Sequence, residues 1–251
     1  MRLPALRLLL CLLCVSMIAA CDQDSGQTSA PSALADSTDN KAPAIAPSGV
    51  PLNLAGIWQR SAGALTPVVL TEYGLAKSQE TDVFDDPNVE CRGYSIPRST
   101  LSGFGVTKIE VGTDHVIFRY EANAGTRKVF LDAKTPSQDS GLNGRSIGSV
   151  ARGAVSIISK EFGEEGKNAF MARGVRDAGT VYPMGEAFTL FERYQVIDNN
   201  TLDFVMVMQD PKILEIPRVI HAQWTRLPDD TPFLQEECVL PEDEFFKAEE
   251  E

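Results

Sequence analysis

The feature that most constrains this chain is a series of short segments, between residues 52 and 240, in which apolar and polar side chains alternate. In the clearest of them Val116, Phe118 and Tyr120 alternate with polar neighbours. A period of two places successive side chains on opposite faces of a β-strand. The same period occurs in residues 104–111, 126–132, 154–160, 167–172, 187–197, 201–209 and 218–226. The sequence therefore predicts a domain built mainly of β-strands.

Turn-forming residues separate these segments. Asn123-Ala124-Gly125 predicts a short hairpin loop, and Asp198-Asn199-Asn200 and Asp210-Pro211 predict two further turns. Only residues 72–79 have a helical pattern. Tight turns join consecutive strands as antiparallel neighbours, and closure of such a meander removes its exposed edges. We therefore predict an all-β fold, an antiparallel up-and-down β-barrel of lipocalin-like form with one short helix near its N-terminal end.

The first twenty residues have the pattern of a secretory signal peptide. Arg2 and Arg7 form a basic start, and residues 8–20 are an apolar stretch shorter than the roughly 20 residues that span a bilayer. The motif Ile18-Ala19-Ala20-Cys21 resembles the lipobox of bacterial lipoproteins. This resemblance implies that Cys21 becomes the acylated first residue of a protein anchored in the cell envelope and facing the periplasm. It leaves the choice of inner or outer membrane open, and the alternative is an ordinary signal peptide cleaved after Ala20.

Composition divides the rest of the chain. Residues 21–51 are rich in Ser, Ala, Pro, Asp and Thr and contain no aromatic residue, so they predict a disordered tether. The barrel domain is predicted to span residues 52–240, and residues 241–251 form an acidic tail. Lys+Arg 23 against Asp+Glu 35 give the chain a net charge of −12. Nucleic acid is therefore not an expected partner, because binding a phosphate backbone requires Lys and Arg to displace counterions.

Two resemblances point to a known architecture. Gly56-Ile57-Trp58 resembles the G-x-W of lipocalins and other calycins, in which the Trp lies under an Arg of the last strand, here Arg226. The chain also resembles a family of uncharacterised bacterial exported proteins with a lipocalin-like strand pattern. The second resemblance rests on residues 70–76, Asp85-Asp86-Pro87, Cys91, Pro97-Arg98, 127–133, 144–148, 192–194, Asp210-Pro211, Trp224 and Cys238. It implies a fold and a compartment, and it brings no established activity.

Cysteine usage predicts a disulfide. Once the signal peptide is removed and Cys21 is acylated, Cys91 and Cys238 are the two thiols that remain. An exported domain meets an oxidising compartment, in which two such thiols pair. We therefore expect a disulfide between Cys91 and Cys238.

Residues 144–148 match G-x-S-x-G, the nucleophile elbow of α/β-hydrolases, with Ser146 at the centre. Such an elbow lies between a buried strand and a helix, whereas residues 153–160 alternate like a strand. The favoured interpretation is a glycine-rich turn that enters a strand, so no catalytic residue is assigned. His115 and His221 are the only histidines, and residues 21–251 contain no C-x-x-C or H-x-x-x-H motif, so neither a metal site nor a cofactor is expected.

Two charged residues lie in phase with apolar ones. Glu192 shares its expected strand face with Leu190 and Tyr194, and Arg127 shares its own with Val129. Buried charges are costly unless they are paired. Arg127 and Glu192 therefore either form an ion pair inside the barrel or, with Tyr194, form the polar end of a ligand pocket.

These features favour a lipid-anchored periplasmic barrel that binds a small, partly apolar molecule. One alternative is a serine hydrolase-like enzyme that uses Ser146 in the same cavity. Another is a non-catalytic structural or interaction protein of the envelope with a filled barrel. The expected partners are the membrane, through the lipid at Cys21, and a small apolar ligand, while the sequence identifies no protein partner.

Overall fold

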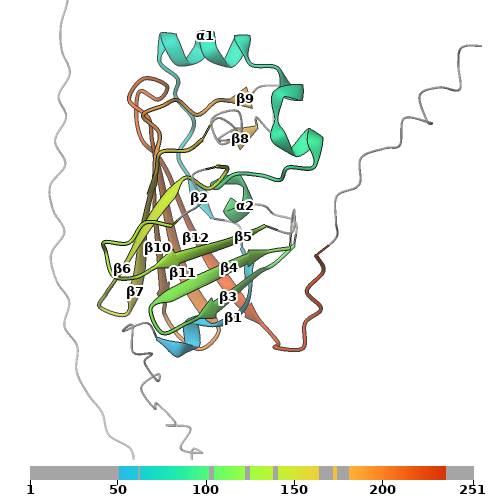
Figure 1. Ribbon diagram of the computed structural model, residues 1–251, viewed down its shortest axis with the longest axis vertical. Helices are drawn as coiled ribbons and strands as arrows, with labels where there is room; N and C mark the ends of the chain where they lie inside the picture. Colours follow the sequence, from blue (N-terminus) through green and yellow to red (C-terminus); the bar gives the residue numbers. More distant parts are fainter. Residues whose placement is uncertain are drawn as a thin grey trace, which may run out of the picture. The chain divides into compact units, whose positions relative to one another are not determined.

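The computed structural model describes residues 51–61, 63–101, 105–121, 125–137, 141–163, 172–173 and 181–235 (Figure 1). The predicted signal peptide and acidic tail lie outside these residues, as does all of the predicted tether except Pro51. Cys21 and Cys238 also lie outside them. The expectations attached to these segments stay predictions.

The described chain forms one ten-stranded antiparallel sheet and a separate two-stranded one. The main sheet runs in the order β5-β4-β3-β1-β12-β11-β10-β7-β6, and β2 pairs with β12. Its strands are β1 (Gly56–Arg60), β2 (Ala64–Leu65), β3 (Thr107–Val111), β4 (His115–Tyr120), β5 (Thr126–Phe130), β6 (Arg145–Ala151), β7 (Ala154–Lys160), β10 (Thr189–Val196), β11 (Thr201–Gln209) and β12 (Arg218–Leu227). The small sheet consists of β8 (Ala172–Arg173) and β9 (Val181–Tyr182). Neighbours in the main sheet are mostly neighbours in sequence, which is the up-and-down order of lipocalin-type barrels.

The sheet curls until β5 approaches β6, and we call this line of approach the seam. Pairing along the seam is short. Asp132 forms an isolated bridge with Ser149, and the Ala133 amide donates to the Gly148 carbonyl at 2.9 Å. A Cβ at Gly148 would lie 2.7 Å from the carbonyl oxygen of Phe130, so glycine permits this approach. The predicted all-β, up-and-down barrel is confirmed, with a nearly complete closure.

Strand alternation directs large aromatic side chains into the barrel. Phe118, Tyr194, Phe204 and Trp224 are buried from four different strands. Their ring centroids follow one another at 4.9 Å from Phe118 to Tyr194, 4.9 Å from Tyr194 to Phe204 and 5.1 Å from Phe204 to Trp224. Such contacts add to the free energy gained by burying the rings. Side chains therefore occupy much of the barrel interior.

The predicted helix is present as α1 (Glu72–Glu80), which in Figure 1 lies beyond the upper ends of the strands. It begins after Thr71, whose side-chain oxygen accepts a hydrogen bond from the Gly74 amide at 2.9 Å. The structure adds the four-residue α2 (Arg98–Leu101), which is too short to produce a helical period in the sequence. Three 3-10 turns are η1 (Leu52–Leu54), η2 (Val83–Asp85) and η3 (Pro87–Glu90). No helix within the described ranges is long and apolar enough to cross a bilayer.

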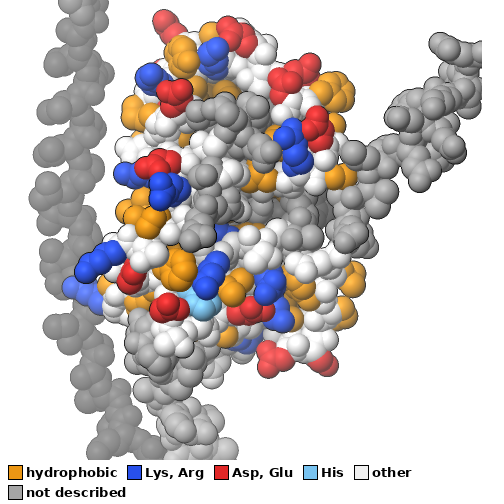
Figure 2. Space-filling view, in the orientation of Figure 1, with side chains coloured by type: hydrophobic (Ala, Val, Ile, Leu, Met, Phe, Trp, Pro, Cys, Tyr) orange, Lys and Arg blue, Asp and Glu red, His pale blue; other side chains and the backbone are white. Residues whose placement is uncertain are grey.

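Strand bounds follow the sequence pattern closely in the second half of the chain. The segments 154–160 and 201–209 coincide with β7 and β11. β3 and β5 are shorter than their segments, which were expected at 104–111 and 126–132. Of the segment 167–172, only Ala172 is described, and it begins β8. Figure 2 shows acidic, basic and apolar side chains interspersed over one face of the molecule.

Arg226 stacks on Trp58 where the chain enters β1. The guanidinium carbon lies 4.2 Å from the centroid of the Trp58 ring. Arg226 also donates hydrogen bonds to the backbone carbonyls of Asn53 and Ala55, the latter at 2.7 Å. Gly56 has φ of 143°, and a Cβ there would collide with the Arg226 guanidinium. The contact that the G-x-W resemblance implied is present, and Gly56 provides its room.

Candidate functional site

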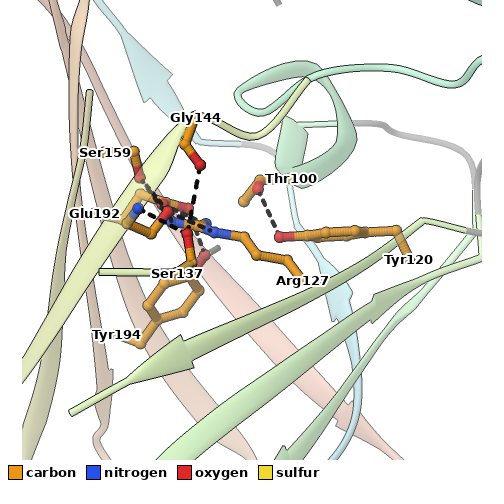
Figure 3. Close-up of polar contacts among 9 residues, drawn as sticks. Thr100, Tyr120, Arg127, Ser137, Gly144, Ser159, Glu192 and Tyr194 are labelled. Atoms are coloured by element: carbon orange, nitrogen blue, oxygen red, sulfur yellow. Dashed lines mark hydrogen bonds and ion pairs between the residues drawn. The ribbon is translucent and has the colours of Figure 1, made fainter. Parts of the chain in front are cut away.

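Four strands bring five polar side chains together inside the barrel. We call them the interior cluster: Arg127 on β5, Ser146 on β6, Ser159 on β7, and Glu192 and Tyr194 on β10. Each has at most 2% of its surface exposed. Figure 3 shows Arg127 extending across the barrel toward Glu192 and Ser159. The predicted ligand-binding residues Arg127, Glu192 and Tyr194 are therefore brought together in the interior.

Arg127 donates hydrogen bonds from all three of its guanidinium nitrogens. Nη1 donates to Oε2 of Glu192 at 2.6 Å, and Nη2 donates to Oγ of Ser159 at 2.8 Å. Nη2 and Nε both donate to Oγ of Ser146, at 3.0 and 3.3 Å. Because Arg127 and Ser146 lie on opposite sides of the seam, these side-chain bonds join β5 to β6 where the backbone ladder is short.

Glu192 and Tyr194 complete the interior cluster. The Tyr194 hydroxyl donates to Oε1 of Glu192 at 2.8 Å. Burial raises the pKa of Tyr194 well above its ordinary value, and the charge of Glu192 raises it further. Burial is the largest single influence on Arg127 and lowers its pKa, but the charge and hydrogen bond of Glu192 together with Tyr120 and Tyr194 outweigh burial, so the net pKa is raised. At neutral pH Tyr194 is therefore protonated and Arg127 is charged.

The polar groups of the interior cluster bond to one another. Both carboxylate oxygens of Glu192 accept a hydrogen bond, and every guanidinium nitrogen of Arg127 donates one. A buried ion pair with this geometry avoids the cost of an unpaired charge. The predicted interior pairing is thus present, while contact of these residues with a ligand stays a prediction.

Ser146 lies within a strand rather than in a turn. The expectation of a glycine-rich turn at residues 144–148 is corrected by β6, since only Gly144, at φ of 62°, precedes the strand. Ser146 is fully buried, and its Oγ lies 2.9 Å from Oγ of Ser159. A strand position here directs the hydroxyl into the interior cluster, whereas a nucleophile elbow would expose it.

Neither histidine is placed to activate Ser146. His115 Nδ1 lies 2.7 Å from Asp114, and His221 Nε2 lies 2.6 Å from Asp203 on the outside of the sheet. A serine nucleophile requires an adjacent general base. The geometry therefore does not support the serine hydrolase alternative. Among the described residues, His, Cys, Asp and Glu form no group of three that could hold a metal ion.

A pocket of about 530 Å³ lies on the outer face of β6, β7 and β10, and we call it the outer pocket. Its lining includes the apolar Ile147, Ile158 and Phe191, the charged Arg145, Lys160 and Glu161, and the neutral Ser149 and Ser156. Figure 2 shows apolar, basic and acidic side chains side by side over the part of this face where Figure 1 draws β6 and β7. The volume falls in the range of small-molecule sites, which spans about 300–1,000 Å³.

The floor of the outer pocket belongs to a row of apolar side chains that crosses the sheet. Ile147 is the register partner of Ile158, and Ile158 is the partner of Phe191. The row continues from Phe191 to Val207 and from Val207 to Val219. Ile147 and Ile158 are 37% and 46% exposed. Apolar side chains gathered on an outer face mark a binding surface more often than scattered ones do.

Polar residues border this row on both sides. Arg145 and Lys160 are register partners two residues from Ile147 and Ile158 in one direction. Ser149 and Ser156 are register partners two residues away in the other direction. The outer pocket therefore has a basic edge, an apolar floor and a hydroxyl edge.

The sequence pattern gives little sign of the outer pocket. In β6 the first two residues that face inward are Ser146 and Gly148, so this part of the strand lacks the apolar alternation of its neighbours. Without β6 as a strand, Ile147 cannot be placed beside Ile158. The sequence does not reveal the register between β6 and β7, which brings these two residues together. The only sign of the outer pocket in the sequence is that Ile147 and Ile158 are apolar residues at outward positions of their strands.

Cys91 follows η3 with φ of 59°. Its expected partner, Cys238, lies outside the described residues. The disulfide between them stays a prediction.

Comparison with known proteins adds little to these observations. No protein-family model and no curated protein matches the sequence. Among solved structures, the chain is similar to a secretary abundant heat soluble (SAHS) protein from Ramazzottius varieornatus, with 11% sequence identity and a TM-score of 0.33. The match covers 70% of this chain and 96% of that chain. A likeness this weak carries no functional argument, and the resemblance to a bacterial exported family stays a prediction.

Proposed function

We propose that this protein is a lipid-anchored barrel of the cell envelope that binds a small, partly apolar molecule, and that the binding site is the outer pocket. The observation that carries the proposal is the outer pocket itself, in which exposed Ile147 and Ile158 lie beside charged side chains. An apolar floor with a few polar groups at its edges is the usual composition of a small-molecule site.

The barrel interior is a poorer candidate for the site. Aromatic rings such as Tyr194, Phe204 and Trp224 contact one another there, and the two charges of the interior cluster are paired with each other. A ligand at the position of these residues would have to displace buried side chains that pack against and bond to one another. The outer pocket requires no such displacement, because its floor is already exposed.

The proposed location rests on sequence alone. The lipobox at residues 18–21 and the short apolar stretch before it support acylation of Cys21. A periplasmic location also accounts for the proposed disulfide between Cys91 and Cys238. The proposal does not choose between the inner and the outer membrane.

A second candidate is a non-catalytic envelope protein that uses its outer surface to bind another protein. The aromatic interior and the exposed row that contains Ile147 and Ile158 favour it. The two candidates differ in what occupies the outer pocket. Mass measurement of the isolated protein can therefore distinguish them.

Native mass spectrometry tests the proposal on the full chain carrying Cys21→Ser, which cannot be acylated. We expect an added mass of a few hundred daltons, in keeping with a pocket of about 530 Å³. Ile158→Ser and Phe191→Ser should remove that mass because they make the floor polar. Ile197→Ser is the matched control, since Ile197 is 56% exposed and does not line the outer pocket. Absence of any bound molecule, or retention of it in both floor variants, would contradict the proposal.

A further inference from the structure

We infer that the ligand of the outer pocket is an amphiphilic anion, whose negatively charged head lies between Arg145 and Lys160 and whose apolar body lies on Ile147, Ile158 and Phe191. This inference rests on the proposed function and adds the chemical class of the ligand. Its basis is the placement of two cations at one edge of an apolar floor.

The two cations directly oppose each other across the β6–β7 hairpin. Arg145 and Lys160 are register partners, and both side chains point outward because the next pair inward, Ser146 and Ser159, is buried. Like charges in directly opposed positions destabilise an antiparallel pair. An anion bound between Arg145 and Lys160 would relieve this repulsion.

Glu161 is the protein's own anion at this edge, and it is a poor substitute for a bound anionic ligand. Glu161 lies 3.5 Å from Nη1 of Arg145, and the Arg145 and Glu161 side chains are 49% and 70% exposed. Exposed pairs of this kind contribute little because water and salt screen them. In the described part of the chain, Lys160 has no ion-pair partner within 4.0 Å. The basic edge therefore has a net positive charge that Glu161 only partly offsets.

The dimensions of the apolar floor indicate the length of the apolar part of the ligand. Ile147, Ile158 and Phe191 lie on three neighbouring strands, so they form a strip about 10 Å long at a strand spacing of about 4.8 Å. The basic edge lies about 7 Å from this strip, two residues along each strand. A head on Arg145 and Lys160 can therefore continue directly into an aliphatic body on the strip.

A free small anion fits this site better than an anionic membrane surface does. The whole chain has a net charge of −12, which opposes its approach to a negatively charged bilayer. Two cations suit one carboxylate, whereas binding to anionic lipid surfaces uses clusters of about four to eight basic residues. We therefore expect the ligand to be a monomeric amphiphile with a single anionic head.

Isothermal titration calorimetry with three probes tests the inference on the full chain carrying Cys21→Ser. The probes are decanoate, 1-decanol and decyltrimethylammonium, which share an apolar chain and differ in the charge of the head. We expect decanoate to bind about tenfold more tightly than decanol, because a charge-assisted hydrogen bond is lost with the alcohol. Decyltrimethylammonium should bind more weakly than decanol.

Substitutions at the basic edge test whether Arg145 and Lys160 bind the anionic head of the ligand. Arg145→Gln together with Lys160→Gln should remove the preference for decanoate and leave the affinity for decanol unchanged. Arg152→Asn is the matched control, because it removes a positive charge from the far end of the same hairpin, about 20 Å away, and asparagine tolerates the φ of 51° found there. Glu161→Gln should strengthen decanoate binding by about twofold to threefold, since it frees Arg145.

The outcomes separate failure of the inference from failure of the proposed function. Equal binding of decanoate and decanol, or a preference for decanoate that survives in the double variant, would overturn the inference and leave the apolar site in place. If none of the three probes binds, both fail. Binding to phosphatidylglycerol vesicles without binding to decanoate would replace the small anion by a membrane surface.

Discussion

The interior cluster and the outer pocket lie on opposite faces of β6, β7 and β10, and they differ in whether their charged side chains are paired. Inside, Arg127 meets Glu192 at 2.6 Å, and both are buried. Outside, Arg145 and Lys160 oppose each other with only the exposed Glu161 nearby. A charge enclosed by the barrel is stable only when the protein pairs it, whereas a charge in water can be left without a strong partner and remain available for a ligand.

The largest expected effect comes from breaking the interior pair. Arg127→Met leaves the Glu192 carboxylate buried without its partner, so the free energy of unfolding should fall by about 3–5 kcal/mol. Arg145→Met, the same change on the outer face, should cost less than about 1 kcal/mol. Urea unfolding of both variants measures the difference.

A double-mutant cycle sharpens this result. The free-energy loss of Arg127→Met with Glu192→Gln should be smaller than the sum of the single losses, because each single variant leaves the other group unpaired. Equal unfolding midpoints for Arg127→Met and Arg145→Met would remove the contrast between the two faces.

An intermediate effect is expected at Ser146, which accepts two hydrogen bonds from Arg127 across the seam. Ser146→Ala removes this acceptor and should lower the free energy of unfolding by about 1–3 kcal/mol. Ser149→Ala, on the outer face of the same strand, should stay within about 0.5 kcal/mol of the wild type. Labelling of Ser146 by a fluorophosphonate probe in the folded protein would contradict its structural role and revive the hydrolase alternative.

The smallest effect concerns Asp132, which forms the isolated bridge at the seam. Hydrogen bonds from Thr135 and Lys134 lower the pKa of Asp132 from 3.8 to about 2. A lowered folded-state pKa stabilises the fold above the unfolded value, and this contribution is lost as the pH falls through the folded value. Asp132→Asn should therefore be less stable than the wild type above pH 3.8, with the gap closing toward pH 2. Unfolding titrations across this range measure the gap, Asp230→Asn is the exposed control, and a gap that persists at pH 2 would contradict the assignment.

Much of the barrel and its interior cluster could be predicted from the sequence. Strict alternation in β4, β10 and β11 gives both the strands and the faces of their side chains. This phase places Glu192 beside Tyr194, and the same argument on β5 directs Arg127 inward. The alternation identifies both the strand and its buried face, because a strand that is buried on one face needs an apolar residue at every second position.

The outer pocket could not be predicted in the same way. It depends on which outward residues of different strands become neighbours, and register between strands is set by turns and tertiary packing. β6 is the clearest case, since inward Ser146 and Gly148 interrupt its apolar pattern. Their polarity and small size have a tertiary cause: Ser146 accepts bonds from Arg127, and Gly148 allows β5 to approach.

The stacking of Arg226 on Trp58 has a consequence for how the sequence can change during evolution. Arg226 bonds to the backbone carbonyls of Asn53 and Ala55, so their side chains can vary while the carbonyls persist. Selection on this end of the barrel then acts on the Trp58 ring, the Arg226 guanidinium and the missing Cβ of Gly56. Lineages that diverge over the rest of the chain can therefore retain little more than a glycine, a tryptophan two residues later and an arginine far along the chain.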